Sequence, residues 1–130
     1  MRSFRVLIVD DEPPVVQFVD RTLRGAGYET TTATDGATAI AAASADGPFD
    51  LLLTDLLMPN MTGEALAASL RRDDPDLPVL YLTGYADQLF KERQQLWANE
   101  TFLDKPTSMQ GLREAVSLAL FGHTNGPPTA

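Results

Sequence analysis

The sequence predicts a doubly wound α/β fold, in which a parallel sheet is covered by helices on both faces. Short runs rich in β-branched and apolar residues alternate five times with segments of helical periodicity. Three of these runs, Val6–Val9, Leu51–Leu53 and Val79–Leu82, are apolar throughout, as expected of strands buried on both faces. With 130 residues, the chain has the length of one domain.

Each expected element has its own signal. The five expected strands are Phe4–Val9, Tyr28–Ala33, Phe49–Thr54, Pro78–Leu82 and Thr101–Leu103. The first helix is predicted from an apolar stripe at helical spacing, formed by Val15, Phe18, Val19, Thr22 and Leu23. Pro14 and Val16 fall off this stripe, beside the acidic residues that follow the first strand.

Four further helices are expected. The second is rich in alanine, begins after Asp35 and ends at Asp46, and the third begins with Thr62 as its N-cap. The fourth and fifth carry apolar residues at helical spacing, which are Leu89, Phe90, Leu96 and Trp97 in the fourth and Met109, Leu112, Val116, Ala119 and Leu120 in the fifth. Thr107 or Ser108 is the expected cap of the last helix.

The composition excludes several classes of protein. The absence of cysteine excludes a disulfide framework, a zinc–thiolate site and a cysteine nucleophile. A net charge of −8 argues against binding to nucleic acid or to an anionic membrane, and suits binding of a cation. No apolar run approaches the roughly 20 residues that a membrane span needs. We expect one folded domain over residues 1–121 and a disordered tail, rich in glycine and proline, over residues 122–130.

Residues whose side chains can bind a metal or take part in a reaction follow four of the expected strands. Asp10–Glu12 follows the first strand, Asp55 the third, Thr83 the fourth and Lys105 the fifth. The carboxyl ends of parallel strands meet at one edge of a sheet, where ligands bind. Clustered carboxylates suit Mg²⁺, and a carboxylate can attack phosphorus while an ammonium and a hydroxyl stabilise the phosphoryl oxygens. The set therefore favours phosphoryl transfer.

Each of these residues also has a purely structural interpretation. Asp10 and Asp11 could equally cap the first helix, and Asp55 could be a turn residue. Taken alone, Lys105 is more often a surface lysine, and Thr83 is more often a hydroxyl at the end of a strand. Four such coincidences at the ends of four strands explain the pattern less well than one common site.

The chain resembles the receiver domain of bacterial two-component response regulators. Four segments carry the resemblance in order and spacing: VLIVDDEP (6–13), LLLTDLLMPNMTG (51–63), VLYLTGY (79–85) and FLDKP (102–106). The resemblance covers residues 3–121. It implies a flavodoxin-like sheet with strand order 2-1-3-4-5 and five helices. It also implies a cytoplasmic signalling module that takes its phosphoryl group from a sensor histidine kinase or a histidine phosphotransfer protein.

The resemblance implies a role for each site residue. Asp55 is the implied phosphoacceptor. Asp11 and Asp55 are implied Mg²⁺ ligands together with the carbonyl oxygen of Leu57, and Asp10 is expected to act through a bound water. Lys105 is expected to contact a phosphoryl oxygen.

Switching and docking residues are implied in the same way. Thr83 is expected to turn toward the phosphoryl group, and Phe102 to move with it, although Phe102 also reads as an ordinary core residue. The surface formed by helix 4, strand 5 and helix 5 would then signal to a downstream protein. Pro14, Val15 and Phe18 are candidate contacts with the kinase, although Val15 and Phe18 read at least as well as core residues.

Three residues depart from the family pattern. Leu57 and Tyr85 stand where many receivers carry polar residues that orient the hydrolytic water, so we expect slow self-dephosphorylation. Thr107 stands where many receivers place an aromatic residue, which puts in doubt a dimer built through helix 4, strand 5 and helix 5.

The sequence is also compatible with other functions. The chain could be the receiver of a hybrid histidine kinase, or a pseudo-receiver that binds partners without phosphorylation. A Mg²⁺-dependent phosphohydrolase with an aspartyl nucleophile would use a similar set of residues, but usually adds a cap domain. No glycine-rich loop follows the first strand, which argues against nucleotide binding. We therefore expect a protein that catalyses only its own phosphorylation and slow dephosphorylation.

Overall fold

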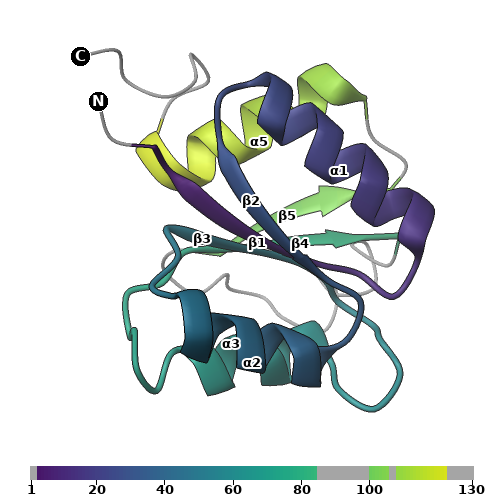
Figure 1. Cartoon of the computed structure of the whole chain (residues 1–130). Helices are drawn as coiled ribbons and strands as arrows, with labels where there is room; N and C mark the ends of the chain where they lie inside the picture. The colour runs from purple at the N-terminus through teal and green to yellow at the C-terminus, as the bar shows by residue number, and fades with distance from the viewer. Residues whose placement is uncertain (1–2, 85–99, 106–107, 123–130) are drawn as a thin grey trace.

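A computed structural model describes residues 3–84, 100–105 and 108–122 of the chain. Its strands are β1 (Arg5–Val9), β2 (Glu29–Ala33), β3 (Leu51–Asp55), β4 (Val79–Thr83) and β5 (Glu100–Asp104). They form one parallel sheet in the order β2-β1-β3-β4-β5 (Figure 1). The predicted sheet and its strand order are confirmed. Strand β3 runs one residue further than predicted and includes Asp55.

The helices cover both faces of the sheet. They are α1 (Pro13–Gly25), α2 (Gly36–Asp46), α3 (Gly63–Leu70) and α5 (Met109–Phe121). Helices α1 and α5 lie on one face, and α2 and α3 lie on the other (Figure 1). The expected fourth helix, with Leu89 and Trp97, lies outside the described residues. Within the described ranges, no helix is long and apolar enough to cross a bilayer.

The sheet separates two hydrophobic clusters. Alternate residues of the central strands point to opposite faces, so that Ile8 and Leu53 pack toward α1 and α5 while Leu7 and Leu52 pack toward α2 and α3. All four side chains are fully buried or nearly so. Burial on both faces explains why these strands read as continuous apolar runs in the sequence.

The predicted stripe of α1 is wrong at one position. Val16, which the sequence placed off the stripe, is buried together with Val19 and Leu23. Val15 and Phe18 are only half-buried and pack at the edge of the cluster. The apolar positions of this helix extend over a wider arc than the part of the helix that packs against the sheet. The sequence alone therefore did not fix the centre of the buried face.

Side-chain caps fix the starts of three helices. Asp35, Thr62 and Ser108 each accept a hydrogen bond from the backbone N–H three residues later, which selects Ser108 over Thr107 for α5. That hydrogen bond lowers the pKa of Asp35. Helix α1 begins differently, since its N-cap residue is Glu12 and makes no side-chain cap bond. The N-cap interpretation of Asp10 and Asp11 is therefore wrong, and both side chains are left for the sheet edge.

Candidate functional site

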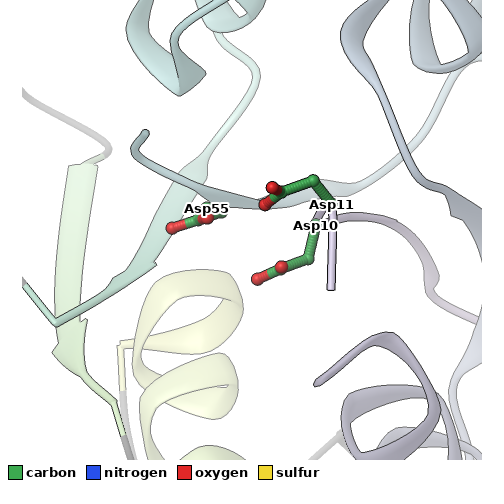
Figure 2. A group of neighbouring side chains, drawn as sticks. All are labelled: Asp10, Asp11 and Asp55. Carbon is green, nitrogen blue, oxygen red and sulfur yellow. The ribbon is translucent and has the colours of Figure 1, made fainter. Parts of the chain in front are cut away.

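Three carboxylates gather where β1 and β3 end. The two strands are neighbours and pair Val9 with Thr54, so the next residues, Asp10 and Asp55, come level with each other. One carboxylate oxygen from each of Asp10, Asp11 and Asp55 lies within 4.8 Å of the other two. The three side chains are shown in Figure 2. Asp10 and Asp55 are buried, whereas Asp11 is exposed. The predicted meeting of these residues at one sheet edge is seen directly.

Lys105 joins the cluster from the end of β5. Its Nζ lies 2.8 Å from Asp10 Oδ2, 3.3 Å from Glu12 Oε2 and 3.5 Å from Asp55 Oδ1. The same lysine therefore faces carboxylates that come from β3 and from the segment after β1. The sequence placed Glu12 at this edge with Asp10 and Asp11, but it did not predict that Glu12 pairs with Lys105. Lys105 is not a free surface lysine, because its side chain is only 19% exposed.

One hydrogen bond and one ion pair hold the buried carboxylate of Asp10 in place. Asp10 Oδ1 accepts a hydrogen bond from the backbone N–H of Glu12, at 2.9 Å. Its other oxygen, Oδ2, is the one nearest to Lys105. Because both oxygens are engaged, the carboxylate of Asp10 is fixed between the start of α1 and the lysine at the end of β5.

The electrostatics of the site favour an added cation. Burial, reinforced by the nearby carboxylate of Asp10, raises the pKa of Asp55 to about 6, although Lys105 acts in the opposite direction. Burial alone would lower the pKa of Lys105, but the carboxylates of Asp10 and Asp55 outweigh burial and raise it above its ordinary value. One ammonium therefore does not balance the negative charge gathered at this edge.

The donor atoms at the site fit a hard divalent cation. They are carboxylate oxygens, and one of the three groups is solvent-exposed while two are buried. Mg²⁺ prefers oxygen ligands of this kind and retains several waters, for which the exposed side leaves access. The raised pKa of Asp55 agrees with this, because burial and, second, the carboxylate of Asp10 disfavour its charged form, which a bound cation would favour.

The loop from β3 to α3 is built tightly around the backbone of Asp55. Thr54 Oγ1 donates a hydrogen bond of 2.9 Å to the Asp55 carbonyl oxygen, and Gly63 N–H donates one of 2.8 Å to the Leu56 carbonyl oxygen. A Cβ atom on Gly63 would lie only 2.3 Å from the Asp55 carbonyl oxygen. Asn60 adopts a positive φ of 70° in the same loop. Sequence reasoning found no individual role for Gly63, because its close neighbour is set by the fold.

The remaining candidate residues are placed less completely. Thr83 ends β4 and pairs with Asp104, one residue before Lys105, which puts its backbone at the same edge. The Phe102 ring stacks on the ring of Tyr81, with centroids 4.9 Å apart. Leu57 is 50% exposed beside Asp55. The side chain of Thr83, and Tyr85 and Thr107 as a whole, lie outside the described part of the chain.

The candidate docking residues lie at the start of α1. Pro14 is exposed, whereas Val15 and Phe18 are half-buried and pack against the cluster between α1 and the sheet. Both interpretations of Val15 and Phe18 remain compatible with this arrangement, since a half-buried side chain contributes to the core and still presents part of its surface.

Comparison with known proteins identifies relatives along nearly the whole chain. Residues 6–117 match the family model of the response regulator receiver domain. The chain is 33% identical over 108 residues to the response regulator receiver protein CpdR of Brucella abortus, which covers 83% of this chain and 89% of CpdR. Four longer transcriptional regulatory proteins of mycobacteria also match, and the chain spans only 33–35% of their length.

Solved structures share the same fold. The chemotaxis protein CheY4 of Vibrio cholerae superposes with a TM-score of 0.79 at 32% identity, covering 92% of this chain and all of that one. The receiver domain of the hybrid histidine kinase CckA gives a TM-score of 0.76 at 34% identity, covering 89% of this chain and 98% of that domain.

Proposed function

Because this chain belongs to the response regulator receiver domain family, we propose that Asp55 accepts a phosphoryl group from the phosphohistidine of a partner protein. Receiver domains are signalling modules of two-component systems, which interact with histidine kinases or phosphotransfer proteins. The observation that carries the proposal is the placement of Lys105 Nζ within 3.5 Å of Asp55 Oδ1, beside three carboxylates at one sheet edge. This arrangement combines a nucleophile, a cation site and an ammonium.

The proposed step is a displacement at phosphorus. An oxygen of the Asp55 carboxylate forms the new bond to phosphorus, while the bond from phosphorus to the histidine nitrogen breaks and its electron pair remains on the imidazole. Lys105 stabilises the negative charge on a phosphoryl oxygen. A Mg²⁺ held by Asp11, Asp55 and the Leu57 carbonyl oxygen, with Asp10 acting through water, would supply further charge neutralisation.

We propose that the phosphoryl group then changes the surface of the domain. The hydroxyl of Thr83 would hydrogen-bond the phosphoryl group, and Phe102 would change its packing with it. The α5 and β5 sides of the domain would present this change to a downstream protein. Pro14, Val15 and Phe18 are the residues that we propose to contact the kinase or phosphotransfer protein, since they lie in the first two turns of α1, which begins two residues after Asp11.

Mass spectrometry with a small phosphodonor tests the proposed acceptor. After incubation with acetyl phosphate and Mg²⁺, we expect the wild-type protein to gain the mass of one phosphoryl group and Asp55→Ala to gain none. Asp46→Asn, at the exposed end of α2, is the matched control and should gain as much as wild type. An unmodified wild type, or full modification of Asp55→Ala, would refute the proposal.

The lifetime of the phosphorylated form gives a further prediction. Leu57 is half-exposed beside Asp55 and offers no polar group to orient an attacking water. We expect slow loss of the phosphoryl group, and faster loss in Leu57→Gln. Decay of the added mass after removal of the phosphodonor measures both rates, and a half-life of seconds in wild type would contradict the prediction.

A receiver that belongs to a hybrid histidine kinase is a second candidate, favoured by the likeness to the receiver domain of CckA. The chain covers 12% of the length of the sensor kinase CckA of Brucella abortus. Both candidates share the proposed chemistry at Asp55. They differ in the phosphodonor, because a hybrid kinase passes the group from a histidine of its own chain.

A further inference from the structure

A second polar cluster lies at the opposite end of β4 and β5. Glu100 begins β5, and its side chain is only 4% exposed. Its Oε2 accepts two hydrogen bonds, one from Arg71 Nη1 at 3.1 Å and one from the Tyr81 hydroxyl at 3.2 Å. A buried carboxylate requires partners of this kind, because an unpaired buried charge is strongly destabilising. We call Arg71, Glu100 and Tyr81 the anchor.

Arg71 connects the anchor to the end of α3. It is the C-cap residue of that helix, and its backbone N–H donates to Ala67 O. Its side chain donates to Leu77 O from Nε at 3.0 Å and from Nη2 at 2.8 Å. One planar guanidinium therefore holds the end of α3, the segment before β4 and the start of β5 together, which a lysine could not do.

Tyr81 connects the anchor to Phe102. The two residues are paired in the register of β4 and β5, and their rings stack with an interplanar angle of 22°. Glu100 and Phe102 are two residues apart on β5 and so lie on the same face. Burial, and then the neighbouring carboxylate of Glu100, raise the pKa of Tyr81, so that its hydroxyl remains a neutral hydrogen-bond donor. The hydroxyl end of the ring is thus fixed while its face supports Phe102.

We propose that Arg71, Glu100 and Tyr81 are positioning residues that set the rotamer of Phe102 by fixing the ring on which it stacks. The functional meaning of this inference rests on the proposed function, in which Phe102 changes its packing on phosphorylation. Through the anchor, the C-terminal end of α3 is connected to Phe102 and so to the proposed change at the phosphorylation edge. Changes at Arg71 are therefore expected to alter the side chain of Phe102 without any contact between the two.

The test follows the Phe102 ring by NMR in the unmodified protein, with ring signals assigned through Phe102→Leu. In Tyr81→Phe the stacking surface remains but the hydrogen bond to Glu100 is lost. We expect the minor rotamers of Phe102 to become roughly fivefold more populated, which is the equivalent of one hydrogen bond. Glu100→Gln keeps an acceptor oxygen and should restore part of the wild-type distribution that Glu100→Ala loses.

Two matched controls separate positioning from general loss of stability. Tyr28→Phe removes the hydroxyl of another buried tyrosine, one with no hydrogen-bond partner among the residues described, and should leave Phe102 unchanged. Arg72→Lys changes the exposed arginine next to Arg71 and should also have no effect, whereas Arg71→Lys should shift the Phe102 ring signals.

The result also separates this inference from the proposed function. Unchanged Phe102 rotamers in both Tyr81→Phe and Arg71→Lys would overturn the positioning role, even if wild type takes up a phosphoryl group at Asp55. Phe102 rotamers that change in Tyr81→Phe and Arg71→Lys but not in the two control variants would support the positioning role, even if wild type takes up no phosphoryl group. In that second case the proposed phosphorylation of Asp55 would be refuted, while the positioning role of the anchor would be supported.

Discussion

The two ends of the sheet differ in how their buried carboxylates are compensated. At the amino ends of the strands, two carboxylates have donors of their own: Asp50 Oδ2 accepts a hydrogen bond of 2.8 Å from the backbone N–H of Arg5, and Glu100 accepts one from Arg71, which also donates to the Leu77 carbonyl oxygen. At the carboxyl ends, several carboxylates share Lys105. The first end stabilises the fold, whereas the second keeps an excess of negative charge that a bound cation would relieve. We expect variants at the two ends to respond differently to pH and to Mg²⁺.

The largest effect is expected where the backbone of the carboxyl end is packed most closely. In Gly63→Ala the new Cβ would meet the Asp55 carbonyl oxygen at 2.3 Å, and backbone cannot move away as a side chain can. We expect a loss of about 3 kcal/mol in the free energy of unfolding, at the upper end of the cost of overpacking. Urea denaturation measures the loss.

Gly25→Ala is the matched control for this substitution. A Cβ at Gly25 would lie 3.5 Å from Nη2 of the Arg113 side chain, which is an ordinary contact distance, so this variant should keep its stability. Equal stability of Gly63→Ala and wild type would show that the loop can rearrange, and that the close approach at Gly63 is not required.

The second effect concerns the charge on Asp55. Its pKa is raised from 3.8 to about 6 in the folded state, so the native protein binds a proton more readily than the unfolded chain does. The resulting stabilisation is complete below about pH 4 and is lost as the pH rises through about 6. Without Mg²⁺, Asp55→Asn should therefore be more stable than wild type at pH 8, by about 2–3 kcal/mol, and similar at pH 4.

Denaturation at several pH values distinguishes this from a general effect of the substitution. Asp46→Asn, at the exposed end of α2, should show no comparable gain at pH 8. A constant difference between Asp55→Asn and wild type from pH 4 to pH 8 would contradict the raised pKa of Asp55.

A smaller effect is expected from adding the cation. Mg²⁺ at ten times its dissociation constant should stabilise the wild-type protein by about 1.4 kcal/mol, by mass action. The midpoint of thermal unfolding should rise with Mg²⁺ in wild type and in Asp46→Asn, and much less in Asp11→Asn. A midpoint in wild type that does not respond to Mg²⁺ would argue against the metal site.

The smallest effect is expected at the amino end. Asp50→Ala removes the carboxylate that accepts a hydrogen bond from the backbone N–H of Arg5. This loss should lower the free energy of unfolding by about 1 kcal/mol. Since this end does not take part in cation binding, the stabilisation by Mg²⁺ should be the same as in wild type. A changed response to Mg²⁺ would mean that the two ends of the sheet are coupled.

The sequence predicted the fold well because its signals were local. Apolar runs predicted the five strands, helical spacing and cap residues predicted the four helices in the described part of the chain, and acidic residues after β1 and β3 predicted the carboxylate cluster. It was wrong about Val16, because the direction in which a helix rests on a sheet depends on both surfaces. It also left open whether Asp10 and Asp11 cap α1, which depends on where the helix begins, at Pro13 with Glu12 as N-cap.

By itself, the sequence determined the order of the elements and which carboxylates and cations stand at the strand ends, since periodicity and strand boundaries are properties of neighbouring residues. The tertiary structure decided which groups meet. It placed Lys105 closer to Asp10 than to Asp55, and it joined Arg71, Glu100 and Tyr81 into one anchor. These contacts link segments far apart along the chain, and only the register and packing of the folded sheet fix the distances between them.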